Sequence, residues 1–304
     1  MNNHDTSARR LVLAIAVGIG VCGCATTDQL SQARQFSTAA AALATATNQA
    51  FTEINDANSE YKMSEVALGR AELTPDTLSG VLDKNNRLKA RQDILNALGK
   101  YATALNGLAT ADTTTAIDKA ATDLSGSVSS LGSGYQTLTG HSLGVSRGDL
   151  AVIATAVKAL GEAYANEKRY EAIKSIVPTA DKWVQTVCAD LASDLKSSPG
   201  TYQTDLQSKY VADFEAYRAE QAGLSYSAKL ARLESLRSET RALAVADTSI
   251  SKVADSALAL AKAHGALSSS LTRPDYKIGD LVDAIGQLQQ YATDIKTFND
   301  SLKK

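Results

Sequence analysis

The chain has 304 residues, with 31 Lys and Arg against 33 Asp and Glu, so its formal net charge is −2. No basic block is present, and nucleic-acid binding, which depends on clustered positive charge, therefore has no support. The composition is rich in small and aliphatic residues, with four Phe, one Trp and four Pro. This favours helices packed through small side chains over a β-sandwich.

The first element in chain order is a short apolar run near the N-terminus. Arg9 and Arg10 precede residues 11–21, all of which are apolar or Gly. A basic segment, a short apolar segment and a small-residue end are typical of a secretory signal. The run is far shorter than the ~20 residues that a membrane-spanning helix needs.

The end of this run, Val21-Cys22-Gly23-Cys24, resembles the lipobox of bacterial lipoproteins. The resemblance implies cleavage after Gly23, loss of the signal peptide 1–23, and lipidation of Cys24. Lipidation at Cys22 is an alternative, but it places Val21 where the lipobox has Gly, Ala or Ser. A second alternative is an uncleaved anchor helix.

Ala25 and Thr26 follow Cys24, where an Asp would favour retention in the inner membrane. The sorting pattern of the family therefore implies the outer membrane. Several acyl chains hold a protein stably on a membrane, whereas one chain binds only marginally. We expect residues 24–304 to form a single domain carried by this anchor.

Residues 28–69 contain no internal Pro or Gly and predict a long helix, which at 1.5 Å per residue would span ~60 Å. Its seam residues are spaced by three and four: Leu30, Ala33, Ser37, Ala40, Ala44, Thr47, Phe51, Ile54, Asn58 and Tyr61. The first half of this seam is small, so a neighbouring helix can approach closely.

Three further features organise the middle of the chain. Thr74-Pro75 predicts a helix start. Thr115 and Asp118 resemble a capping box with Asp in place of Glu, and Ser146 with Asp149 predicts another cap after a break at 140–148. The two seams between these starts are Ile94, Leu98, Tyr101, Leu105 and Leu108, and then Ile117, Ala121, Leu124, Val128, Leu131, Tyr135 and Leu138.

The second half predicts a helix from about 150 to Pro178, a shorter one over 183–195, and a run over 201–246 with an irregularity near Gly223. Seams over 250–271 and 278–302 complete the chain. All four prolines fall at expected breaks, and no stretch alternates like a strand. The prediction is an all-α fold: an elongated antiparallel helical bundle with long, coiled-coil-like helices.

Gly144 to Gly148 matches the G-x-S-x-G pattern of hydrolases, with Ser146 in the nucleophile position. That chemistry needs a strand before the Ser and a downstream acid and His. Here a helix precedes the Ser, and His264 lies within a helical seam, so Ser146 is interpreted as a helix cap. Residues 147–149, Arg-Gly-Asp, match an adhesion tripeptide but are equally explained as a loop and a helix start.

Metal and thiol chemistry have little support. His141 and His264 lack the spacing of a bundle metal site, and Cys188 has no partner at metal-ligand spacing. We predict that Cys188 is a core thiol and that the chain needs no metal or cofactor.

Tyrosines are the one compositional oddity, with eleven in the chain. Those at or near seam positions, which are Tyr101, Tyr135, Tyr164, Tyr210 and Tyr217, are either core rings with hydroxyls at the rim or a binding surface. Carboxylates and tyrosines over 162–171 fit a solvated face or a polar groove.

Together these features predict a lipid-anchored protein on the periplasmic face of the bacterial outer membrane. Its expected role is a structural or protein-interaction module of the cell envelope, not an enzyme. Its expected partners are the membrane, through the lipid on Cys24, and an envelope protein. The alternative is a binding module that holds a small apolar ligand between helices.

Overall fold

The computed structural model describes residues 5–75, 87–146, 148–151, 153, 166–197 and 199–302. Every regular element in these residues is helical, which confirms the predicted all-α bundle. The helices are α1 (Asp5–Ala67), α3 (Arg87–Thr110), α4 (Thr114–Thr139), α6 (Asn166–Ser197), α7 (Pro199–Glu220), α8 (Tyr226–Thr272) and α9 (Ile278–Leu302), with a 3-10 turn, η1 (Gln221–Gly223), between α7 and α8.

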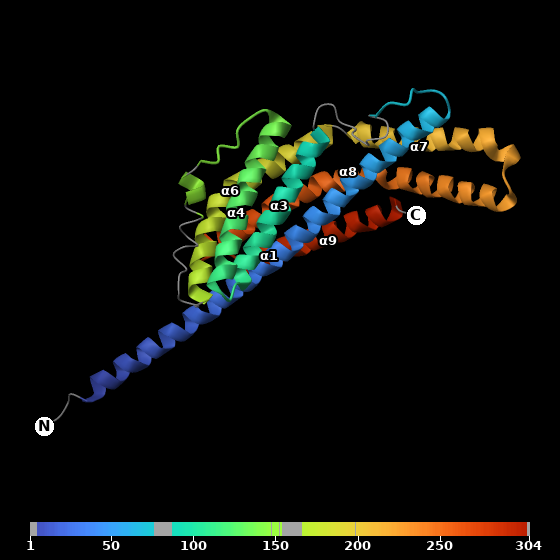
Figure 1. Ribbon diagram of the computed structural model, residues 1–304. Coiled ribbons are helices and arrows are strands. Elements are labelled where there is room, and N and C mark those ends of the chain that lie inside the picture. Colours follow the sequence, from blue (N-terminus) through green and yellow to red (C-terminus); the bar gives the residue numbers. More distant parts are fainter. Residues whose placement is uncertain are drawn as a thin grey trace.

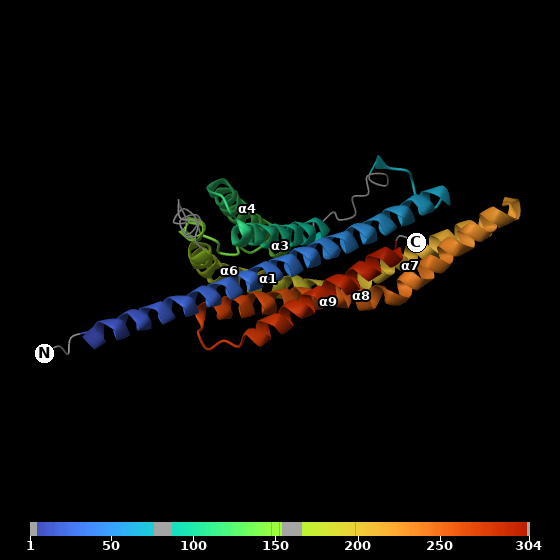
Figure 2. The same ribbon diagram turned by 90° about the horizontal axis from the view of Figure 1, so that it is seen from below.

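The molecule is elongated, and α1 runs along most of its length (Figures 1 and 2). Consecutive helices such as α3 and α4, or α7 and α8, form antiparallel hairpins. By contrast, α1 runs parallel to α9 and to α7, as its contacts with Asn299 and Asp213 show. We call residues 199–242 the arm, and the helices α3, α4, α6 and α9 with the adjoining parts of α1 and α8 the body.

Small residues let α1 lie close to its neighbours in the body. Ala33, Ser37, Ala40, Ala44 and Thr47 are all buried, as the predicted seam requires. The approach to α3 is tightest at Gly99, where an added Cβ would lie 3.1 Å from the Ala44 Cβ. Any larger residue there would push the two helices apart.

The start of α4 differs by two residues from the prediction. Thr113, not Thr115, is the cap: its side chain accepts a hydrogen bond from the Ala116 N–H at 3.2 Å. At the other end, Gly140 adopts a left-handed φ of 77° and its N–H donates to the Gln136 carbonyl. Such a C-cap suits Gly because it has no Cβ to clash.

The predicted break at Pro178 is wrong, because α6 continues through it. Pro removes one N–H from the helix, so the backbone carbonyl four residues earlier loses its intrahelical partner. The neighbours Ile176, Val177 and Ala180 are fully buried in the core. Their burial on one continuous face outweighs the missing hydrogen bond, and from Asn166 onward the residues on both sides of Pro178 form one helix.

The run predicted over 201–246 is two helices rather than one. The irregularity near Gly223 is the turn between α7 and α8. Helix α8 then continues to Thr272, so the seam predicted over 250–271 belongs to the same helix as residues 226–246. Residues 76–86, where the helix after Thr74-Pro75 was expected to begin, lie outside the described residues, and α3 is described from Arg87.

Candidate functional site

The predicted anchor residues, Gly23 and Cys24, lie in α1, whose backbone is helical from Asp5 onward. The side chains of residues 1–26 lie outside the described set. Among the described helices, none is both long enough and apolar enough to cross a membrane. From Cys24 to Ala67, α1 is unbroken and ~65 Å long at 1.5 Å per residue.

The residues that a hydrolase would need are not brought together. Ser146 follows an irregular loop, not a strand, and its hydroxyl donates to the Asp149 carboxylate at 2.7 Å. The Asp149 N–H donates back to the Ser146 hydroxyl at 3.1 Å, as predicted for a cap. These bonds hold the pKa of Asp149 below its ordinary value. His264 has other partners altogether.

The remaining candidates for metal or thiol chemistry are also separate. His141 is exposed just after the end of α4, and Cys188 is fully buried in α6. Burial raises the pKa of the Cys188 thiol to about 12, so it stays protonated at neutral pH. Within the described part of the chain, no three His, Cys, Asp or Glu side chains are grouped to hold a metal ion.

A buried polar chain crosses the body through His264, on α8. The His264 Nδ1 lies 2.8 Å from the Asp181 carboxylate on α6, and its Nε2 lies 2.9 Å from the Tyr101 hydroxyl on α3. Because an ionised carboxylate can only accept, Nδ1 carries a proton, and in the neutral imidazole Nε2 then accepts from the Tyr101 hydroxyl. Phe36 of α1 packs edge-on against the imidazole at 5.6 Å between ring centroids. These side-chain contacts therefore link four helices: α1, α3, α6 and α8.

The environment of this chain matches a structural role. Burial, together with the charge of Asp181, raises the pKa of Tyr101. Burial alone would raise the pKa of Asp181, but hydrogen bonds from His264 and Gln185 outweigh it and lower that pKa. The helical spacing around His264 predicts its place in a seam but not its partners, because Tyr101 and Asp181 lie on helices far away in the sequence.

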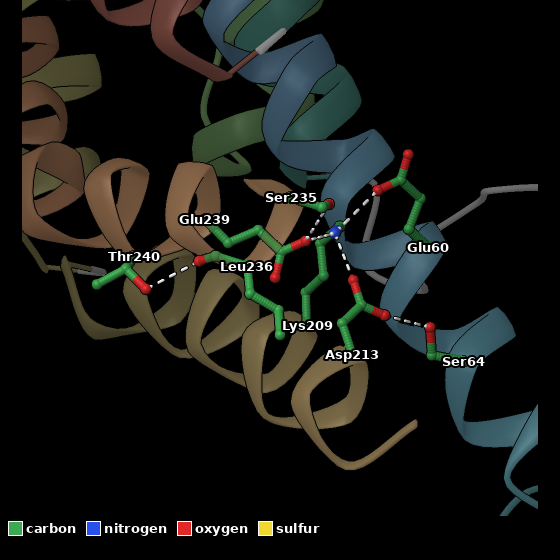
Figure 3. A network of polar contacts seen from close by, with 8 residues as sticks. All are labelled: Glu60, Ser64, Lys209, Asp213, Ser235, Leu236, Glu239 and Thr240. Atoms are coloured by element: carbon green, nitrogen blue, oxygen red, sulfur yellow. Dashed lines mark hydrogen bonds and ion pairs between the residues drawn. The ribbon is translucent and has the colours of Figure 1, made fainter. Parts of the chain in front are cut away.

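A second polar network holds the arm to the far end of α1 (Figure 3). The Lys209 ammonium of α7 lies 2.7 Å from Asp213, 2.7 Å from Glu239 of α8 and 3.3 Å from Glu60 of α1. Ser64 of α1 donates to Asp213 at 2.8 Å. We call Lys209, Asp213, Glu239, Glu60 and Ser64 the lysine hub. It ties three helices together by charge.

The hub shifts the acidities of its members in opposite directions. Burial would lower the pKa of Lys209, but the hydrogen bonds to Asp213 and Glu239 raise it. Burial works against ionised Asp213, yet the bond from Lys209 lowers its pKa. Burial raises the pKa of Glu239, with Asp213 adding to the effect. Nothing in the sequence pattern pointed to this cluster, whose carboxylates come from three helices.

The outer face of the arm carries apolar side chains that the sequence grouped with core seams. Phe214 on α7 and Leu230 and Leu233 on α8 are 40%, 45% and 47% exposed. Tyr226, at the start of α8, is 82% exposed. Because Tyr226, Leu230 and Leu233 are spaced by four and then three residues, they share one face of α8. We call these three residues the arm stripe.

An open groove of about 900 Å³ lies between α1, α3 and α4. Its floor is built from small residues, among them Ala44, Gly99, Gly107 and Ala120, and its polar lining includes Lys100. The volume is in the range of small-molecule pockets. This groove is where the alternative hypothesis, a ligand held between helices, would apply.

The tyrosines predicted at or near seam positions lie partly in the body and partly in the arm. Tyr101 and Tyr135 are buried in the body, and the Tyr135 hydroxyl donates to Asp190 at 2.7 Å, as expected for core rings with bonded hydroxyls. Tyr210 and Tyr217 are half-buried on the arm. Tyr164 lies outside the described residues, as do the side chains of 162–168 in the predicted polar cluster; of the remainder, Arg169 donates to the Ala111 carbonyl at 2.6 Å, Tyr170 is half-buried and Glu171 is exposed.

Neither a protein-family model nor a curated protein nor a solved structure matches this chain.

Proposed function

We propose that the chain is a bacterial lipoprotein, anchored by lipid on Cys24 to the periplasmic face of the outer membrane, and that it works by contact with other envelope proteins. The observation that supports this most directly is the path of α1. This helix is unbroken from Cys24 to Ala67, and the arm packs against its far end. It would hold the arm ~65 Å from the anchored residue.

The chemistry of the two regions also favours contact over catalysis. The polar side chains that could serve an enzyme have structural partners: Ser146 caps a helix, and His264 links Tyr101 to Asp181. The arm, in contrast, exposes Tyr226, Leu230 and Leu233 in one stripe. Exposed apolar patches on a protein surface commonly mark interaction sites.

Replacing the acceptor thiol tests the anchor. Cys24→Ser should abolish incorporation of labelled fatty acid and move the protein out of the membrane fraction, since the proposed acceptor thiol is gone. Cys22→Ser is the matched control, two residues away, and should keep the label. If Cys22→Ser loses the label while Cys24→Ser keeps it, the acceptor assignment is wrong.

A second candidate function rests on the groove between α1, α3 and α4. In this case the full chain, released from membranes with mild detergent, should retain an apolar molecule that native mass spectrometry detects. Thr103 is an exposed residue in the lining. Thr103→Trp should fill the groove and remove the added mass. A native mass equal to that of the lipidated chain alone argues against this function.

A further inference from the structure

The arm stripe continues as a short coiled-coil seam along α8. Tyr226, Leu230, Leu233 and Arg237 recur at steps of four, three and four, so they follow one exposed face. Ala242, which is buried, points away from this face, whereas Leu236, which is also buried, lies beside it and marks the edge where α8 meets the rest of the protein. The seam therefore has no partner within the described part of the chain.

The charges beside the seam identify the kind of partner. With Leu230 at position a and Leu233 at position d, Lys229 occupies position g and Glu234 position e. In a parallel, in-register pair of helices, each g residue faces the e residue five positions later on the other helix. Neither Lys229 nor Glu234 makes an ion pair with the described residues of its own chain. A second copy would supply the missing charge to both.

We infer that the arm stripe is a self-association surface, through which two copies of this chain pair by parallel contact of α8. A twofold axis along the helices would form two Lys229–Glu234 pairs and would set Leu230 against Leu230 and Leu233 against Leu233. An antiparallel pair would place like edges of the helices together, Lys229 beside Lys229, and would lose both ion pairs.

The orientation rests on the proposed lipid anchor. Two copies held by Cys24 on the same membrane point the same way, so their arms meet in parallel. The seam ends at Arg237, whose charge at an a position weakens a pair and limits it to about two heptads. Confinement of both copies to one membrane raises the local concentration of the two surfaces, which allows a weak contact to form.

Disulfide trapping in native membranes tests the pairing. Leu230→Cys in the full chain should give a product of twice the chain mass under mild oxidation, because residues at a positions of a parallel pair face each other. Leu258→Cys is the matched control: it lies on the same helix and is 41% exposed, against 45% for Leu230. Cys188 is buried, and the unsubstituted chain gives the background.

Charge reversal tests the orientation. Adding Lys229→Glu to Leu230→Cys sets two carboxylates together at each pair and should reduce the product about tenfold. Adding Glu234→Lys as well restores opposite charges and should restore the product. A product that is unchanged by Lys229→Glu would overturn the parallel register.

Two further outcomes would overturn self-association. One is a yield from Leu230→Cys no greater than from Leu258→Cys, and the other is a product of a different mass, which would indicate another protein. Cys24→Ser in the same background separates the two proposals. If the crosslinked product persists in Cys24→Ser, the copies associate without the anchor. Membrane fractionation of the same variant shows separately whether Cys24 carries the anchor.

Discussion

The body and the arm are both built from long helices, but different forces hold them. The body buries a single apolar cluster that includes Leu105, Leu124 and Ile173. Of the arm's described residues, the buried apolar ones are few, and Leu206, Ala212 and Leu236 lie outside that cluster. In their place the lysine hub ties α7 and α8 to α1.

This difference implies that the two regions respond to different perturbations. Apolar burial contributes about 25 cal/mol per Å² and does not depend on charge screening. Ion pairs near the surface contribute less, and salt screens their exposed members. A region with few buried contacts also opens locally at lower free energy than a packed core. The arm should therefore loosen first, and its loosening should depend on pH and salt through the lysine hub.

The largest effect should come from a cavity in the body. Leu124 is fully buried, and Leu124→Ala should lower the free energy of unfolding by about 2–5 kcal/mol in denaturant titrations. Leu230→Ala removes the same atoms from the 45% exposed stripe of the arm and should change stability by less than about 0.5 kcal/mol. Equal losses would mean that the body and the arm are packed alike.

The next largest effect should come from the buried hydrogen bonds of His264 in the body. His264→Leu leaves the Tyr101 hydroxyl and the Asp181 carboxylate without their partner, at a loss of about 2–3 kcal/mol. Tyr101→Phe removes one bond and should lose about 1 kcal/mol. A double-mutant cycle on these two positions measures their coupling. Additive losses would show that Tyr101 and His264 do not act as one network.

Tyr101 also makes the body sensitive to alkali. Its pKa in the fold is raised above the ordinary 10.0, so the fold favours the neutral phenol. The resulting stability is present below pH 10 and is lost as the pH rises beyond it. Denaturant titrations at pH 9 and pH 11 should show a decline for the native chain that Tyr101→Phe reduces.

Local spacing was sufficient to predict that the elements are helices, but it predicted neither all of their bounds nor their partners. The steps of three and four through Leu124, Val128 and Leu131 identified a face that is indeed buried. Pro178 was misjudged because the burial of Ile176 and Val177 overrides a local signal for a break. Only the tertiary arrangement of the helices decides such a case.

The lack of tertiary information in a sequence pattern also explains why it did not predict the arm stripe or the lysine hub. Leu230 and Leu233 have the spacing of core residues, yet no helix of the described chain covers them. Lys209 and Glu239 are ordinary charged residues in sequence, and only the pairing of α7 with α8 brings them to 2.7 Å. A periodic pattern shows that a face is apolar, but not which helix, or which chain, packs on it.

A smaller and local effect should follow from removing the hub cation. Lys209→Met leaves Asp213 and Glu239 facing each other, partly buried, and should destabilise the arm by about 1–3 kcal/mol at neutral pH. Hydrogen exchange should increase in α7 and in residues 226–242 of α8, while α3 and α4 are unchanged. An increase spread evenly over both regions would contradict an arm that opens separately.

Mild acidification should protect the arm more strongly in this variant than in the native chain. In the native chain Lys209 holds the pKa of Asp213 below its ordinary 3.8, so that carboxylate keeps its contribution to stability down to about pH 4, while the raised pKa of Glu239 favours the fold as the pH falls. In Lys209→Met the two carboxylates repel each other when ionised, and protonating either one at pH 4.5 relieves that repulsion. Hydrogen-exchange rates of the arm at pH 7 and pH 4.5, corrected for intrinsic exchange, show whether acidification stabilises or destabilises it.

The smallest effects should come from two helix caps with similar hydrogen-bond lengths, one in each region. Thr113 caps α4 in the body by accepting from the Ala116 N–H at 3.2 Å, and Ser225 caps α8 in the arm by accepting from the Ala228 N–H at 3.3 Å. Replacing either by Ala removes the capping hydrogen bond, with an expected loss of about 1 kcal/mol, and Ser225→Ala also removes a contact with the Ser227 hydroxyl at 3.1 Å. If the arm opens before the body, Thr113→Ala should lower the free energy of global unfolding. Ser225→Ala should instead act mainly on hydrogen exchange at the start of α8, because global unfolding begins from molecules whose arm is already open. Equal shifts of the global denaturation midpoint would mean that the arm and the body unfold together, and that the charge-held end of the molecule is as firmly fixed as its apolar core.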